Sequence, residues 1–287
     1  MIKLLPVKRL KNLNTEDFLQ NYKKMVKPVV IEQLTRQWPA REKWAADYFK
    51  QVAGDTQVPL YACVPATEHK HQHAVATTMT LKKYLERLEQ GKTDLRLFFY
   101  NILSGVPKLT QDFSYPEIGL NFFKKLPVLF IAGQGTKVQM HFDIDLADIF
   151  LCHFGGKKKV ILFPPEQSRY MYHVPFSFSS LFAVDFEHPD YQRYPALNYL
   201  QGEEVELNHG DVLYIPPGYW HFIVYQEFGM SIALRAFPRT PVNFFKMMNN
   251  LIVIRSIEGL MRKLLGQRWV ARNERRAVSN THKNLPA

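Results

Sequence analysis

From about residue 125 to residue 240, short apolar segments follow one another at close spacing, with turn-forming residues between them. The segments are "PVLFIAG", "VQMHFD", "DIFLCHFGGKKKVILFPP", "EEVELNHGDVLYIPPG" and "WHFIVYQEFGMSIALRAF". Runs of this kind, bounded by Gly and Pro, are typical of the strands of a β-sandwich or β-barrel. The pattern therefore predicts a mainly β fold for this half of the chain.

The first ninety-odd residues alternate between helical and strand patterns. We expect helices in "NTEDFLQNYKKMV", "REKWAADYFKQVAG" and "MTLKKYLERLEQGK", with Asn14 or Thr15 capping the first, Gly54 ending the second and Thr80 capping the third. Strands are expected in "KPVVIEQL", "QVPLYACV" and "DLRLFFYNI". The segment 166–200 is irregular and rich in Tyr, Phe and Pro, which indicates a long insertion. For the chain as a whole we therefore expect an α+β fold with a β core.

A helical segment follows the β-rich part, starting at Thr240 and Pro241. The apolar residues of "VNFFKMMNNLIVIRSIEGLMRKLLG" cover too much of the helix circumference for a simple surface helix, so a second copy of the chain is the expected partner. We therefore divide the chain into a domain over 1–240, with its β core at about 95–240, and a C-terminal helical extension over 241–287. The apolar surface of this extension predicts that the protein forms a homodimer.

The charge of the chain is concentrated in this extension. The formal net charge is +11, and the residues from 240 onward carry nine Lys or Arg against two Glu. Such a segment can bind nucleic acid or an acidic partner, or it can be a solvated helix face.

The bulk composition excludes other classes of protein. A hydrophobic fraction of 46% over 287 residues supports a large core. No run reaches the ~18 apolar residues that a membrane span needs, and we expect no secretion signal. Cys63 and Cys152 lie in apolar segments, so reduced thiols and a cytoplasmic location are expected.

Two polar residues interrupt the strand pattern of "QMHFDID". His141 and Asp143 are two residues apart, so on a strand they project from the same face. An imidazole and a carboxylate suit Fe(II), Mn(II) or Zn(II). The expected third ligand is His221, at the end of "GDVLYIPPGYWH", which we interpret as a hairpin whose second strand begins at Trp220. The three would form a facial triad with open positions for substrate and O2.

Each of these residues also has an ordinary structural interpretation. His141 alone could be a core histidine, Asp143 could cap a turn, and His221 could bridge a barrel rim. The competing polar residues nearby are Asp145, Asp148 and His153. The alternating histidines of "EHKHQH" (68–73) could chelate a metal, but a solvated loop is the preferred interpretation.

A dicarboxylate co-substrate would need a cation deep in the barrel. "FGGKKKVILFPP" offers three lysines at the start of a strand. Alternation allows either Lys158 alone, or Lys157 together with Lys159, to point inward.

"HFD", "GGKKKVILFPPEQ", "HPDYQRYPAL", "GDVLYIPPGYWH" and the N-terminal "TEDFLQNYKKMVKPVVIEQLTRQWPAREKW" together resemble the JmjC/cupin-type Fe(II)- and 2-oxoglutarate-dependent oxygenases. Within that family they are most similar to the branch of the asparaginyl hydroxylase factor inhibiting HIF. The resemblance covers residues 5 to 240. It implies a double-stranded β-helix, that is, a cupin or jelly-roll barrel, with Fe(II) on His141, Asp143 and His221.

The resemblance also implies residues for the co-substrate. Counting from Gly156, the lysine that binds the distal carboxylate of 2-oxoglutarate is Lys158. A family tyrosine corresponds to Phe98 or, two residues along on the same face, to Tyr100, which we prefer.

Three positions depart from the branch. They are Val138 in place of a threonine, Ile149 in place of an asparagine, and Arg235 in place of a second asparagine. Arg235 could itself bind a carboxylate of the co-substrate.

The sequence thus predicts a 2-oxoglutarate-dependent iron dioxygenase that hydroxylates a C–H bond, with a protein side chain as the preferred substrate. The family's use of a C-terminal extension for dimerisation explains "FFKMMNNLIVI" better than RNA binding does. The alternatives are hydroxylation of an RNA, such as a tRNA base, through the basic C-terminal region, a zinc or manganese cupin enzyme, and a non-catalytic cupin-like binding module.

Overall fold

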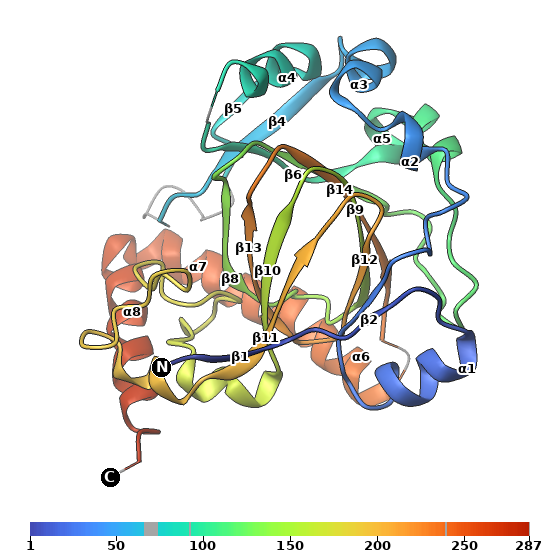
Figure 1. Ribbon diagram of the computed structural model, residues 1–287. Coiled ribbons are helices and arrows are strands. Elements are labelled where there is room, and N and C mark those ends of the chain that lie inside the picture. Colours follow the sequence, from blue (N-terminus) through green and yellow to red (C-terminus); the bar gives the residue numbers. More distant parts are fainter. Residues whose placement is uncertain (66–73, 92, 239, 287) are drawn as a thin grey trace.

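The computed structural model describes residues 1–65, 74–91, 93–238 and 240–286. Within these residues the strands form two sheets that face each other around one interior (Figure 1). The smaller sheet has the order β1 (Lys3–Pro6), β11 (Gln201–Leu207), β10 (Lys158–Phe163), β13 (Trp220–Tyr225) and β8 (Lys137–His141). The larger sheet has the order β2 (Arg9–Leu10), β3 (Val29–Ile31), β12 (Val212–Ile215), β9 (Asp148–Gly155), β14 (Gly229–Ala236), β7 (Val128–Ala132), β6 (Leu95–Asn101), β4 (Gln57–Ala62) and β5 (Thr77–Thr80).

Apolar residues from both sheets fill the space between them. Val160 and Ile223 of the smaller sheet share one buried cluster with Leu151 and Leu213 of the larger sheet. Because successive side chains of a strand alternate between its two faces, each strand gives this interior every second residue. The arrangement is the predicted jelly-roll barrel, and it confirms the mainly β fold class with N-terminal α/β elements and C-terminal helices.

Helices surround the barrel at its ends (Figure 1). Those of the N-terminal half are α1 (Thr15–Phe18), α2 (Ala40–Lys43), α3 (Ala46–Ala53), α4 (Leu81–Glu89) and α5 (Ile102–Gly105). Those of the C-terminal segment are α6 (Pro241–Met248), α7 (Arg255–Leu265) and α8 (Gln267–His282), with a π-helical turn, η5 (Asn249–Ile254), between the first two. The remaining turns are the π-helical η1 (Leu19–Lys23) and the 3-10 turns η2 (Pro107–Asp112), η3 (Pro165–Tyr170) and η4 (Pro195–Tyr199).

The predicted caps begin two of these helices. The side chain of Asn14 accepts a hydrogen bond from the Asp17 backbone at 2.8 Å, and that of Thr80 accepts one from the Lys83 backbone at 3.3 Å. Each satisfies an amide that the helix itself leaves without an acceptor. The helix expected over "REKWAADYFKQVAG" is broken in two, because Trp44 leaves the helical region with ψ at 90°.

The prediction of a hairpin over residues 210–221 is wrong. β12 pairs with β3 and β9 in the larger sheet, whereas β13 pairs with β10 and β8 in the smaller one. The turn "PPGY" therefore carries the chain from one sheet to the other. The predicted start of the second strand at Trp220 is correct, and it brings His221 into the sheet that also holds β8.

The irregular segment 166–200 is ordered and covers the outer face of the smaller sheet. Met171, Tyr172 and Tyr194 are buried there in one cluster with Trp220 and Phe222 of β13. The other face of β13 is thereby left to line the barrel interior.

The C-terminal helices lie against this insertion and the barrel mouth. The Nδ2 of Asn250 donates to the Ile144 carbonyl at 3.2 Å, and the Nδ2 of Asn284 donates to the Arg169 carbonyl at 3.2 Å. Much of the apolar surface of the segment stays exposed, at Val242, Phe244, Phe245, Ile252, Val253, Leu260 and Leu264. No helix in the described ranges combines the length and apolarity that crossing a membrane requires.

Candidate active site

Three predicted ligands meet where β8 and β13 run side by side. His141 pairs directly with His221, and their ring centroids are 4.2 Å apart. Asp143 follows β8 by two residues, and one ligand atom from each of the three residues lies within 4.8 Å of the others. Two imidazoles and a carboxylate at this separation can hold one divalent metal ion.

Backbone carbonyls orient both imidazoles. The Nδ1 of His141 lies 2.7 Å from the Gln139 carbonyl oxygen, and the Nδ1 of His221 lies 3.1 Å from the Tyr219 carbonyl oxygen. A carbonyl can only accept, so each contact places the ring proton on Nδ1 and presents Nε2 as the metal donor. The tautomer that a metal needs is therefore set by the protein backbone.

Asp143 is held ionised by its neighbours. Burial alone would raise the pKa of this carboxyl, but the Arg235 guanidinium and the two imidazoles outweigh burial and lower the pKa to about 2. Arg235 Nη2 lies 3.2 Å from the Asp143 carboxylate, and the guanidinium also donates to both oxygens of Asp145 at 2.8 and 2.5 Å. Asp145 thus holds Arg235 in place, and Arg235 in turn orients Asp143.

The triad opens into a cavity inside the barrel that encloses about 610 Å³, its mouth included. Apolar side chains dominate its lining, among them Phe98, Phe130 and Ile223, and its charged residues besides Asp143 are cations. They are Arg96, Lys158 and Arg235. An apolar pocket with a few convergent polar groups is the usual form of a small-molecule site.

Alternation in β10 selects Lys158 among the three lysines. Its side chain is 1% exposed, whereas Lys157 and Lys159 form ion pairs on the outside of the sheet with Glu206 and Glu204. Within the described residues Lys158 has no carboxylate partner. Burial lowers the pKa of its ammonium group to about 7.

A short hydrogen-bonded chain orients Lys158. Its Nζ donates to the Ser231 hydroxyl at 2.6 Å, and it lies 4.1 Å from the centroid of the Tyr225 ring. Ser231 Oγ is 3.1 Å from the Nδ1 of His153, whose Nε2 is 2.8 Å from the Gly156 carbonyl. Burial and the Lys158 charge lower the pKa of His153 to about 3, so the ring is neutral. The Nδ1 of His153 also lies 3.1 Å from the Met230 carbonyl oxygen, so the neutral ring has a backbone carbonyl near each nitrogen and the serine hydroxyl beside Nδ1.

The structure does not bring Tyr100 into the lining of this cavity. The pairing of β6 with β7 shifts register between Leu97 and Tyr100, and Phe99 has a positive φ of 50°. This irregularity ends the alternation, so Phe98 and Phe99 line the cavity while Tyr100 packs against the neighbouring core. Its hydroxyl fills the space beside Gly105, 1.7 Å from the position that a Cβ there would occupy.

The three positions at which the sequence departs from the related branch all line the cavity. Val138 and Ile149 line it as apolar wall residues, and Arg235 reaches the metal side of it. Sequence reasoning missed Arg96, Ser231 and Tyr225. A single cation inside the apolar run "LRLFFYN" was an available signal, because a charge in a buried strand needs a partner.

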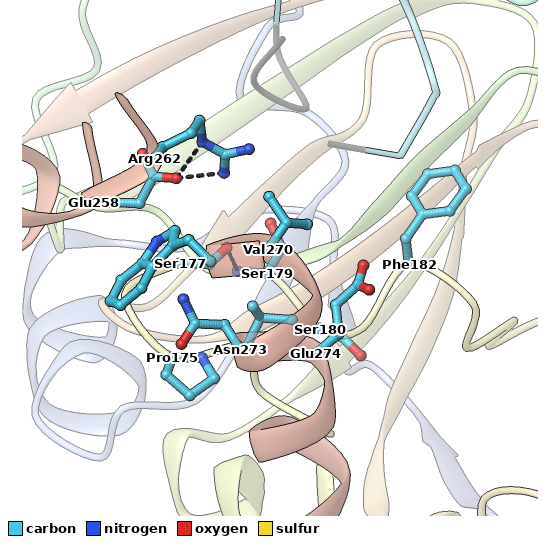
Figure 2. Close-up of a pocket in the computed structure, with 12 residues that line it drawn as sticks. Pro175, Ser177, Ser179, Ser180, Phe182, Glu258, Arg262, Val270, Asn273 and Glu274 are labelled. Carbon is cyan, nitrogen blue, oxygen red and sulfur yellow. Dashed lines mark hydrogen bonds and ion pairs between the residues drawn. The ribbon is translucent and has the colours of Figure 1, made fainter. Parts of the chain in front are cut away.

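A second cavity lies between the insertion and the C-terminal helices (Figure 2). Its lining includes Ser179 of the insertion and Asn273 of α8. Ser179 forms an antiparallel bridge with His141, so α8 approaches the strand that carries the triad. The alternating histidines at 69–73 lie outside the described residues.

Comparison with known proteins shows the family to which the chain belongs. The sequence model of the cupin-like domain family matches residues 15–243. The chain is 28% identical to the tRNA wybutosine-synthesizing protein 5 of Homo sapiens over 253 residues, which are 80% of this chain and 77% of that protein. It is also 28% identical to the lysine-specific demethylase JMJ30 of Arabidopsis thaliana, over 81% of this chain and 57% of that protein, and 27% identical to the lysine-specific demethylase 8 of Danio rerio, over 79% and 57%.

The jelly-roll barrel and its His–Asp–His donor set define a metal-dependent cupin oxygenase. The chain belongs to the cupin-like domain family, and within it to the JmjC-type oxygenases that use Fe(II) and 2-oxoglutarate. The particular branch suggested by the sequence stays a prediction.

Proposed function

We propose that His141, Asp143 and His221 hold the Fe(II) ion and that Lys158 binds the distal carboxylate of 2-oxoglutarate. The observation that carries this assignment is the convergence of three donor atoms within 4.8 Å at one part of a cavity that also contains a buried lysine, for which the described residues supply no carboxylate partner. The donor set and the cationic lining fit an iron ion and a dicarboxylate.

A bound Fe(II) ion with 2-oxoglutarate and O2 would supply the oxidation of a C–H bond to C–OH, in which one oxygen atom enters the substrate and the other enters succinate, with release of CO2. The residues of this chain bind, orient and exclude water. Arg235 keeps Asp143 ionised and fixed, and the backbone carbonyls keep both imidazoles in the donor tautomer. Val138 and Ile149 make the wall apolar where the related branch has polar groups, so Lys158 and its serine carry more of the co-substrate's recognition.

For the substrate we propose an RNA, which reverses the preference for a protein side chain. On α8 the arginines Arg268, Arg272, Arg275 and Arg276 are all exposed at a spacing that puts them on one side of the helix, opposite the buried Val270 and Ala277. Such a stripe can contact successive phosphates. The similarity to a tRNA wybutosine-synthesizing protein, which covers most of both chains, supports the same choice.

Hydroxylation of a protein side chain is the second candidate. It is supported by the similarity to lysine-specific demethylases, although this chain spans little more than half of their length.

The proposal includes two features of the whole chain. The exposed apolar residues of the C-terminal helices, such as Phe245 at 70% exposure, support a homodimer through the extension after residue 240. Cys63 and Cys152 are both thiols, which supports a reducing, cytoplasmic location.

The site assignment is tested with anaerobically purified protein. We expect one iron per chain, tight calorimetric binding of 2-oxoglutarate only when the metal is present, and formation of succinate. Loss of all three signals in His141→Ala supports the assignment. Failure of the wild-type protein to bind 2-oxoglutarate with iron present would refute it and leave the non-catalytic binding module, and turnover without 2-oxoglutarate would indicate another type of cupin enzyme.

The substrate class is tested by the salt dependence of RNA binding. We expect tRNA to bind with an affinity that falls steeply with salt, and Arg272→Glu with Arg276→Glu to lower the slope of log K against log salt by about two. Lys83→Glu, on the exposed face of α4, is the matched control and leaves the slope unchanged. A tRNA affinity that does not vary with salt, or succinate formation that peptides stimulate and tRNA does not, would favour the protein substrate.

A further inference from the structure

A buried arginine in β6 lacks the partner that such a residue normally has. Arg96 is 3% exposed, and its Nη1 donates to the Lys137 carbonyl at 2.7 Å. Its Nε has no hydrogen-bond partner, and no carboxylate within the described ranges forms an ion pair with it. Its guanidinium carbon lies 5.3 Å from the Phe98 ring centroid. The side chain therefore keeps a full charge in a mostly apolar wall.

The other buried arginine of the same cavity shows what is missing. Arg235 has two carboxylates within 3.2 Å. An uncompensated buried charge destabilises the folded protein, so a fold retains one only where an anion arrives from outside or where function requires it. Arg96 and Lys158 are both such charges, and both line the cavity that holds the triad.

The strand register places the two cations at the same end of the barrel. Lys158 pairs with Tyr225, and the neighbouring Val224 pairs with Lys137, whose carbonyl binds Arg96. β10, β13 and β8 lie side by side there (Figure 1). Tyr225 is four residues from His221 on β13, which is roughly 13 Å along a strand.

We propose that Arg96 is a second binding residue for the distal carboxylate of 2-oxoglutarate, which it holds together with Lys158. This inference rests on the proposed function. Arg96 supplies a planar donor fork to the carboxylate, whereas Lys158 supplies a point charge aimed by Ser231. In this pocket Arg96 has the carboxylate-binding role that the sequence had suggested for Tyr100.

The two cations differ in how they respond to pH. Lys158 lies beside the Ser231 hydroxyl and the Tyr225 ring, with the neutral His153 next to that serine, and its pKa of about 7 means that it loses its charge as the pH rises through neutrality. A guanidinium group does not lose its proton in proteins. A pocket with both cations retains affinity at pH 8 to 9, whereas a pocket with Lys158 alone loses up to tenfold per pH unit.

The experiment is calorimetric titration of Mn(II)-loaded protein with 2-oxoglutarate and, separately, with pyruvate, which lacks the distal carboxylate. We expect Arg96→Met to weaken 2-oxoglutarate binding about 30-fold, from the loss of charge-assisted hydrogen bonds, and to change pyruvate binding less than about threefold. Arg96→Lys should restore part of the affinity. Thermal denaturation of each variant shows that the fold is kept.

The pH profile separates binding from a structural role. In Arg96→Met the affinity for 2-oxoglutarate should fall steeply above pH 7, and in Lys158→Met it should be low but nearly independent of pH. Equal losses for 2-oxoglutarate and pyruvate, or an unchanged pH profile in Arg96→Met, would overturn the role of Arg96. Absence of binding to the wild-type protein would instead overturn the proposed function itself.

Discussion

Replacing Lys158 by Met should make the protein more stable while it removes the co-substrate site. The side chain is buried, and its pKa falls from 10.5 to about 7 on folding. At roughly 1.4 kcal/mol per pH unit, this shift corresponds to at most about 5 kcal/mol of cost for the buried ammonium. The substitution also removes the hydrogen bond of Lys158 to Ser231 and its contact with the Tyr225 ring. Their loss offsets about 3 kcal/mol of the gain in stability. The expected net gain at pH 6 is about 2 kcal/mol.

The sign of the pH dependence is fixed by the direction of the shift. Below pH 7 the lysine is charged in both states, so its cost is fully present in the folded protein. Between pH 7 and 10.5 the unfolded chain binds the proton and the folded one does not, so the stability of the wild type rises with pH. The advantage of Lys158→Met should therefore shrink by about 1.4 kcal/mol per pH unit above pH 7.

Urea denaturation of the metal-free proteins at pH 6, 7, 8 and 9 measures this difference. Lys159→Met is the matched control, because Lys159 lies on the outer face of the same strand and pairs with Glu204 at 2.8 Å. We expect the control to change stability by less than about 1 kcal/mol at every pH. A Lys158→Met protein that is less stable than the wild type at pH 6, or a difference that does not vary with pH, would refute the reasoning.

Other outcomes follow from the same geometry. His141→Ala should lower iron content to background and succinate formation at least ~10³-fold, and measurable turnover by that variant with full iron content would exclude it as a ligand. Asp145→Asn should weaken the clamp on Arg235 and reduce Fe(II) affinity about 10- to 100-fold in a competition titration; unchanged affinity would show that Asp145 has no influence on the metal. Phe245→Glu should shift sedimentation from dimer to monomer with normal 2-oxoglutarate binding, whereas a wild-type protein that sediments as a monomer contradicts the dimer. Phe18→Ala, which removes a fully buried ring 4.9 Å from the Tyr214 ring, should cost about 3–5 kcal/mol in chemical denaturation, and a cost below 1 kcal/mol would contradict its place in the core.

Local signals gave correct predictions wherever the cause was local. The caps at Asn14 and Thr80 act within one turn, and both are formed. The spacing of His141 and Asp143 predicted one site for both, and the structure brings them together although β8 ends at His141 and Asp143 lies two residues beyond it.

Predictions failed where a local pattern had two outcomes. The turn before His221 joins two sheets instead of two paired strands, because β3 and β9 occupy the edges of β12. The bulge in β6 sends Tyr100 to the opposite side from the one that alternation predicts. A bulge adds one residue to one strand of a pair, and single-sequence periodicity does not reveal it.

The sequence by itself determined the mainly β fold and the three candidate metal ligands. These depend on alternation and on residue chemistry, which are properties of short segments. Only the tertiary structure decided that Arg96 shares the cavity with Lys158, that Arg235 is held by Asp145 beside Asp143, and that Tyr100 lies elsewhere. Each of these facts depends on which strands become neighbours and in what register, and register is set by the packing of the whole barrel.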